Sequence, residues 1–270
     1  MHTQKKSHAC HLSRLIFLMA ALCAHTSLAA PPHPWVTDNP RLDKNAWFSN
    51  LHSGAEVQSP FVVKFGLTGI GIAAVKKPVD GAGHHHLLID RDLPLDFTEP
   101  LPFTDQYVHF GKGQMEAILD LPPGDHTLRL VFADNKHIPN FVYSDVLRVK
   151  VTGPSGRSVE QLKRKEVTVL APDAGARVQA PFDLVLHASG YNVSHTDITE
   201  PDTGHFRVRL KGATGDEAVI DLPGGETEVW LNPPAGTYTA SVELMNNSAP
   251  GQAMAVSPPV KFEVRARQGL

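Results

Sequence analysis

Five of the histidines between residues 84 and 137 have the residue type and spacing for metal chemistry. Three are consecutive, His84, His85 and His86, and two more follow at His109 and His137. Neutral imidazole is a common ligand of copper, zinc and nickel, and two histidines separated by one strand residue point to the same side. We therefore predict a metal site with His84 and His86 as ligands, completed by His137 or His109.

Acidic residues nearby in the sequence could support such a site. Asp134, Glu116 and Asp90 could bind the metal directly or accept a hydrogen bond from the far nitrogen of a ligating ring. His85 is expected to fill the rim of the hydrophobic core instead. A hydrogen-bonded histidine cluster without a metal is the alternative that these residues leave open.

The first 29 residues are typical of a cleaved export signal. An apolar run at residues 15–24 is too short to span a bilayer, and the small residues after it predict cleavage after Ala29. Three basic residues precede the run: Lys5, Lys6 and Arg14. We expect a periplasmic or secreted protein with no membrane span in its mature form.

Cysteine content limits the kinds of metal centre that the protein can hold, and net charge limits its kinds of macromolecular partner. Both cysteines, Cys10 and Cys23, would leave with the signal, which excludes iron–sulfur, cysteine-bound zinc and blue-copper centres. Cu(II), Zn(II) and Ni(II) remain, and a periplasmic location favours copper. The formal net charge of −3 argues against nucleic acid or an anionic membrane as a partner.

The sequence contains two copies of one domain, and the five histidines lie in the first copy. Residues 54–61 (GAEVQSPF) match residues 175–182 (GARVQAPF), and Gly83-His84 matches Gly204-His205 at the same offset of 121 residues. Residues 122–127 match residues 234–239 at an offset of 112, so the first copy carries about nine extra residues, within an insertion at 91–105. The expected parts are an N-terminal extension at 30–45, a first copy at 46–152, a linker at 153–164 and a second copy at 165–266.

Each copy reads as short strands separated by turns. The sequence contains 21 glycines and 22 prolines, and apolar residues alternate with polar ones, as at Phe61, Val63 and Phe65. About seven such strands per copy predict an all-β protein with two tandem immunoglobulin-like antiparallel β-sandwiches. Tyr238 is expected to fold back onto its own backbone in a tyrosine corner, and His126 takes its place in the first copy.

The topology of such a sandwich brings distant loops together. The start of the third strand lies beside the end of the sixth, so His84, His85, His86, His109 and His137 should meet at one pole. By alternation, His84 and His86 should project from the outer face of the sheet, and His85 should point inward. His126 should lie at the opposite pole.

Residues 47–151 resemble the bacterial exported family known as domain of unknown function 4399. The resemblance rests on four spaced blocks: residues 47–66 (WFSNLHSGAEVQSPFVVKFG), 83–90 (GHHHLLID), 109–116 (HFGKGQME) and 123–137 (PGDHTLRLVFADNKH). The family implies no activity for this chain. The resemblance implies that the histidine-rich blocks are the family's distinguishing feature.

The second copy has lost the histidines that would bind a metal. It keeps His205 but has Phe206, Arg207, Asp221 and Ala249 at the other positions. We therefore expect the first copy to be a histidine-based module for copper or zinc.

The alternative is a non-catalytic sandwich that binds an envelope polymer or protein, with a structural histidine cluster. Four aromatic residues near the loop pole could supply its contacts: Phe103, Tyr107, Phe110 and Phe141. An enzyme is the least expected class, because no nucleophile paired with a base stands out.

Overall fold

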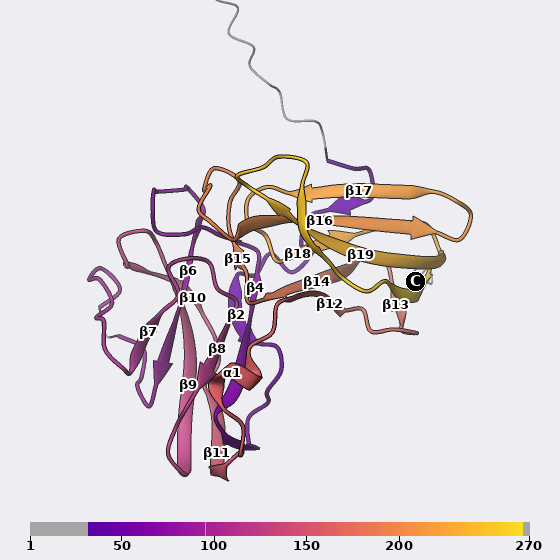
Figure 1. Cartoon of the computed structure of the whole chain (residues 1–270). Coiled ribbons are helices and arrows are strands. Elements are labelled where there is room, and N and C mark those ends of the chain that lie inside the picture. The colour runs from indigo at the N-terminus through magenta and orange to yellow at the C-terminus, as the bar shows by residue number, and fades with distance from the viewer. Residues whose placement is uncertain (1–31, 95, 267–270) are drawn as a thin grey trace, which may run out of the picture. The chain divides into compact units, whose positions relative to one another are not determined.

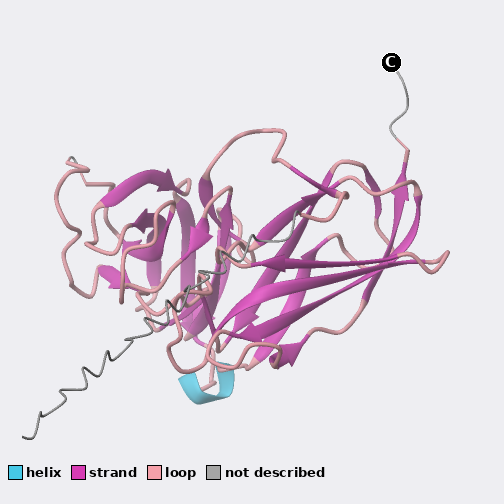
Figure 2. Ribbon diagram, turned by 90° about the horizontal axis from the view of Figure 1, so that it is seen from above, coloured by secondary structure: helices cyan, strands magenta, loops and turns pink. Residues whose placement is uncertain are grey.

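β-Strands make up nearly all of the regular structure in the computed structural model, which describes residues 32–94 and 96–266 (Figures 1 and 2). The predicted all-β fold is confirmed. The expected export signal, its cleavage site and both cysteines lie outside the described residues. The one described helix, α1 (Val159–Leu162), has a single turn, so no helix in this part of the chain is long enough to cross a membrane.

The strands of the first copy form two sheets. The smaller sheet has the order β2 (Asn45–Phe48), β4 (Phe61–Thr68) and β8 (Glu116–Leu119). The larger sheet has the order β3 (Ala55–Ser59), β11 (Leu147–Pro154), β9 (Gly124–Ala133), β6 (Ala82–Ile89) and β5 (Gly71–Ile72). In addition, β7 (Tyr107–His109) pairs with β6, and β10 (Pro139–Tyr143) pairs with β9.

The strands of the second copy repeat this arrangement. One sheet contains β18 (Glu228–Leu231), β14 (Phe182–Ser189) and β12 (Glu166–Ala171). The other has the order β13 (Arg177–Gln179), β21 (Val260–Arg265), β19 (Gly236–Asn246), β16 (Thr203–Gly212) and β15 (Asn192–Val193). Here β17 (Glu217–Leu222) pairs with β16, and β20 (Ala253–Val256) pairs with β19.

Strand registers follow the offset found in the sequence. Asn45 pairs with Thr68 across β2 and β4, and Glu166 pairs with Ser189 across β12 and β14. The residue numbers of both partners are 121 higher in the second copy than in the first. The two copies therefore share their strand pairing as well as their sequence pattern.

The N-terminal extension contributes a strand to the second copy. In β1 (Val36–Thr37), Val36 pairs with Leu231 and Thr37 with Trp230, both on β18. The Asn232 amide donates to the Trp35 carbonyl at 2.7 Å. The extension precedes the first copy in sequence, yet it completes a sheet of the second.

The tyrosine corner of the second copy has a histidine counterpart in the first. The Tyr238 hydroxyl donates to the Pro234 carbonyl at 2.9 Å, and His126 Nε2 lies 2.9 Å from the carbonyl of Pro122, the equivalent residue. His126 Nδ1 lies 2.8 Å from an Asp90 carboxylate oxygen. Partial burial opposes protonation, but the hydrogen bonds to Asp90 and Pro122 dominate and raise the pKa of His126.

Backbone groups join the two copies at close range. The Val193 amide donates to the Gly113 carbonyl at 2.8 Å, and the Ile72 amide donates to the Gly225 carbonyl at 2.8 Å. Gly113 has a φ of +93°, and a Cβ atom there would lie 2.0 Å from the Val193 carbonyl oxygen. A glycine is therefore needed at this contact for its conformation and for its small size.

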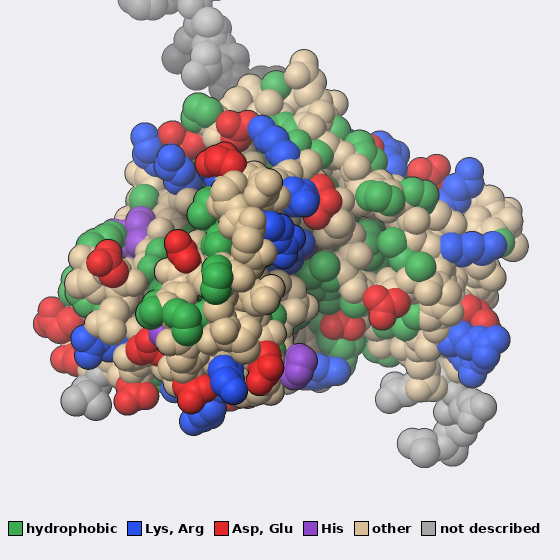
Figure 3. Space-filling model, turned by 60° about the horizontal axis from the view of Figure 1, so that its bottom comes forward, with side chains coloured by type: hydrophobic (Ala, Val, Ile, Leu, Met, Phe, Trp, Pro, Cys, Tyr) green, Lys and Arg blue, Asp and Glu red, His purple; other side chains and the backbone are tan. Residues whose placement is uncertain are grey.

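Charged side chains of both signs are interspersed on the face of the molecule shown in Figure 3.

We predict that Gly113→Ala destabilises the protein more than Gly54→Ala. Gly54 has a similar φ of +90°, but a Cβ atom there would have nothing within 4 Å, so its replacement costs only the backbone strain, about 1 to 2 kcal/mol. Gly113→Ala adds a backbone clash to the same strain. Urea denaturation of both variants measures the difference, and equal free energies of unfolding would contradict the required close contact.

Candidate metal centre

The three consecutive histidines separate onto the two faces of the larger sheet of the first copy. His85 points into the core, where its ring centroid lies 5.3 Å from those of Phe65 and Phe132. His84 and His86 point to the other face, as alternation along β6 requires. All three residues have a relative exposure of 0%. Sequence reasoning placed His84 and His86 on the outer face but missed their complete burial.

Neighbouring elements bring two more histidines over this face. β7 lies beside β6 in antiparallel register, with His109 opposite His86. His137 follows β9, and its loop is closed by the Asp134 side chain, which accepts hydrogen bonds from the amides of Lys136 and Ile138. His84, His86, His109 and His137 thus form one group, called the histidine cluster below.

Leu101 and Phe103, both in the insertion at 91–105, cover the cluster. The Leu101 amide donates to the His137 carbonyl at 2.9 Å, and Leu101 is buried against Leu88 and Val131 of the sheet. The Phe103 ring lies edge-on to His109 and His137, with centroid separations of 5.1 and 4.8 Å. Phe103 itself remains 61% exposed, so it forms the outermost layer over the cluster.

The imidazole nitrogens of the cluster face one another. His84 Nε2 lies 2.9 Å from His86 Nε2 and 3.3 Å from His137 Nδ1. One nitrogen from each of the four residues can be chosen so that all lie within 4.8 Å of one another. Zinc–nitrogen bonds of about 2.0 to 2.1 Å in a tetrahedron separate the nitrogens by about 3.3 Å. Small side-chain adjustments would therefore fit the four rings around one ion.

Burial keeps the rings of His84, His86 and His109 neutral. Loss of solvent, followed by the Coulombic effect of the neighbouring rings, lowers the pKa of His84 to about 2 and that of His86 to about 3. The same causes lower the pKa of His109. A neutral imidazole has a lone pair free for a metal, so these three rings need no deprotonation at neutral pH before they bind one.

Several ring nitrogens lack a hydrogen-bond partner within the described residues. They are His84 Nδ1, His86 Nδ1 and His109 Nε2. Buried polar atoms are normally satisfied, so a cluster with unpaired nitrogens is costly as a purely structural element.

The three acidic residues expected near the site have other partners. Asp90 binds His126 through its side chain and also accepts from the Thr127 amide at 2.8 Å. Glu116 accepts a hydrogen bond from the Ser189 hydroxyl at 2.7 Å and lies 3.4 Å from His187 Nε2 in the second copy. Burial opposes ionisation of Glu116, but these bonds lower its pKa. Asp134 shapes the loop that carries His137.

The second copy fills the same sheet positions with an ion pair. Arg207 and Asp221 pair in register as His86 and His109 do, and Arg207 Nε donates to Asp221 Oδ1 at 2.6 Å. His205, the counterpart of His84, lies 2.7 Å from the Asn247 side-chain oxygen. An arginine–aspartate ion pair in the second copy thus stands where the first copy has the two imidazoles of His86 and His109.

Residues 63–152 match the model of the family described as Domain of unknown function (DUF4399). The match confirms the resemblance seen in the sequence, and its range includes the whole histidine cluster. A search of curated protein sequences gave no match.

Among solved structures, the chain is similar to fibronectin(III)-like modules of CbhA from Clostridium thermocellum. The identity is 13% over 83% of this chain and 94% of that one, with a TM-score of 0.26. It is also similar to the FN1–FN3 domains of chicken CNTN1, at 11% identity over 82% of this chain and 65% of that one, with a TM-score of 0.24. These similarities concern the fold alone.

We predict that His85→Phe makes stability less dependent on pH. Burial lowers the pKa of His85 to about 3 from 6.5, so below pH 6 the unfolded chain takes up a proton that the folded protein does not. Stability contributed by neutral His85 is therefore lost as the pH falls from about 6 toward 3, by about 1.4 kcal/mol per pH unit. The variant should lack this part of the slope.

Urea denaturation of the metal-free protein between pH 4 and 6 measures the slopes. Phe206 occupies the equivalent core position in the second copy, so the variant is expected to fold. An unchanged slope would show that His85 does not stay neutral in the folded protein.

Proposed function

We propose that the DUF4399 domain of this protein binds a transition-metal ion, Cu(II) or Zn(II), through His84, His86, His109 and His137. The observation that carries the proposal is the convergence of four imidazoles, with one nitrogen of each within 4.8 Å of the others. Burial, which lowers the pKa of His84, His86 and His109 and keeps these three rings neutral, supports it further. We also infer export to the periplasm or beyond from the N-terminal sequence.

The geometry favours metal binding or transfer over catalysis. Catalytic zinc sites commonly combine three protein ligands with an open position for water or substrate, whereas four protein ligands complete a tetrahedron. In the cluster, four imidazoles are available and Phe103 lies over two of them. A bound ion would be enclosed by protein ligands.

The ligand set is suited to borderline metals. Imidazole binds Zn(II) and Cu(II) well, whereas Mg²⁺ and Ca²⁺ prefer oxygen ligands. No carboxylate belongs to the cluster among the described residues. An exported protein would meet copper in an oxidising compartment, which is why we retain copper beside zinc.

We predict that His84→Ala combined with His86→Ala abolishes stoichiometric metal binding. Removal of two of four ligands should weaken the affinity by about 100-fold or more, since even changes to residues that support ligands cost 10- to 100-fold. Calorimetric titration of the full chain with CuCl₂ and with ZnCl₂ measures the affinity. Elemental analysis of protein purified from the periplasm measures the metal content.

His205→Ala is the matched control, because His205 occupies the strand position of His84 in the second copy. It should retain the metal content and affinity of the unaltered protein. Equal metal binding by the double variant and by this control would exclude the histidine cluster as the site.

Exposed aromatic rings favour a second function, binding of an envelope polymer or protein. Phe97 and Phe141 stack with their centroids 5.0 Å apart, and Phe141 is 80% exposed. The Arg129 guanidinium lies 5.2 Å from the centre of the neighbouring Tyr143 ring. Exposed aromatic groups of this kind mark interaction surfaces.

Sedimentation with purified peptidoglycan tests this second function. Phe141→Ala should reduce the bound fraction, whereas the His84 and His86 double variant should not. Absence of sedimentation by the unaltered protein would remove peptidoglycan as the polymer.

A further inference from the structure

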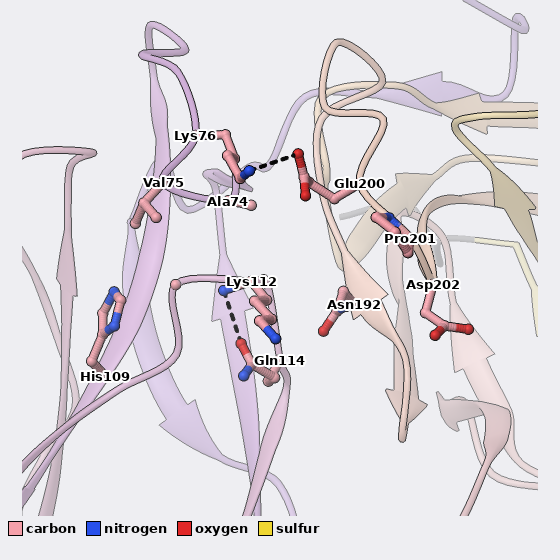
Figure 4. Close-up of a pocket in the computed structure, with 11 residues that line it drawn as sticks. Ala74, Val75, Lys76, His109, Lys112, Gln114, Asn192, Glu200, Pro201 and Asp202 are labelled. Atoms are coloured by element: carbon pink, nitrogen blue, oxygen red, sulfur yellow. Dashed lines mark hydrogen bonds and ion pairs between the residues drawn. The ribbon is translucent and has the colours of Figure 1, made fainter.

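A cavity of about 610 Å³ lies where the two copies meet (Figure 4). The first copy supplies Val75, Lys112 and Gln114 to its wall, and the second copy supplies Asn192 and Pro201. This volume is in the range of small-molecule sites. The cavity also borders His109 but otherwise consists of residues outside the histidine cluster.

Only one of the cations at this cavity lacks an ion pair among the described residues. Lys76 pairs with Glu200 at 3.3 Å, and Asp202 on the opposite wall pairs with Lys165 at 3.1 Å. The Lys112 ammonium has no such partner in residues 32–94 and 96–266. Both carboxylates of the cavity wall, Glu200 and Asp202, are thus paired with other lysines, and the Lys112 ammonium is left without an ion-pair partner in this part of the chain.

Two side-chain amides lie beside this charge. Gln114 Oε1 accepts a hydrogen bond from the Lys112 amide at 3.0 Å, which leaves the Gln114 amide nitrogen as a donor. Asn192 joins Gln114 through an isolated backbone bridge, and its side chain makes no hydrogen bond within the described part of the chain. In Figure 4, the Lys112, Gln114 and Asn192 side chains occupy the same part of the cavity.

The backbone around Lys112 is held on both sides. A Cβ atom at Gly111 would lie 2.3 Å from His109 Nε2, and one at Gly113 would lie 2.0 Å from the Val193 carbonyl oxygen. The Gly111-Lys112-Gly113 turn is therefore packed against the histidine on one side and the second copy on the other. Its position is fixed before any ligand arrives, which lowers the entropy cost of binding.

We propose that this cavity binds a small organic anion. Its carboxylate or phosphate group would accept hydrogen bonds from Lys112, Gln114 and Asn192, and its apolar part would contact Val75 and Pro201. A charged donor with neighbouring amides is suited to an oxyanion, and hydrogen bonds to charged groups are stronger than neutral ones. The proposal goes beyond metal binding and does not require it.

Titrations of the metal-free full chain with benzoate, phenyl phosphate and benzylamine test the proposal by ligand-observed NMR. Benzoate or phenyl phosphate should bind, and benzylamine, which has a similar size and the opposite charge, should not. The tighter of the two anions identifies the preferred acidic group. Because metal is absent throughout, the result does not depend on the histidine cluster.

Lys112→Gln should weaken binding of the anion by about tenfold or more, the effect of losing one charge-assisted hydrogen bond. Lys77→Gln is the matched control, because Lys77 pairs with Asp197 at 3.3 Å and does not line the cavity. Val75→Trp should also weaken binding by filling the apolar part.

Three outcomes would overturn the proposal. They are no binding of either anion up to about 10 mM, where even weak site binding is measurable, equal binding of benzylamine, and equal losses in Lys112→Gln and Lys77→Gln.

Discussion

Successive side chains of β6 point to opposite faces of its sheet, and this alternation governs the use of the three consecutive histidines. His85 enters the core between Phe65 and Phe132. His84 and His86 are left on the other face, where the register of β7 brings His109 alongside. A shift of the pairing by one residue would exchange the two faces and dissolve the arrangement. The candidate centre therefore depends on strand register before it depends on any single contact.

The side chains on this sheet face interact differently in the two copies. In the second copy, Arg207 and Asp221 attract each other across the strands at a partly exposed position. In the first copy, neutral rings occupy the corresponding space under the insertion, and some of their nitrogens have no partner among the described residues. His84 lies within hydrogen-bond distance of both His86 and His137, and such bonds between neutral groups contribute about 1 kcal/mol each. The metal ion that we propose would bond to the nitrogens that face one another, among them His84 Nε2, His86 Nε2 and His137 Nδ1.

Much of this arrangement could be predicted from the sequence. The offset of 121 residues and the alternation of apolar residues predict the sandwich topology, and the topology brings His84, His109 and His137 together. Burial of the cluster could not be predicted. The insertion that carries Phe103 has no strand pattern, so the sequence does not indicate which face of the sheet it packs against. The partner of Glu116 was missed for a related reason, since Ser189 belongs to the other copy and no pattern within one copy points to it.

The attachment of β1 to β18 has a consequence for how the chain matures. The backbone groups of Val36 pair with Leu231, which lies far away in the sequence. Such distant pairings form late, because closing a long loop is entropically expensive. The N-terminal segment would therefore remain unpaired until the second copy has folded. Attachment of this segment thus depends on the second copy, so the start of the described chain is held by a module that lies far away in the sequence.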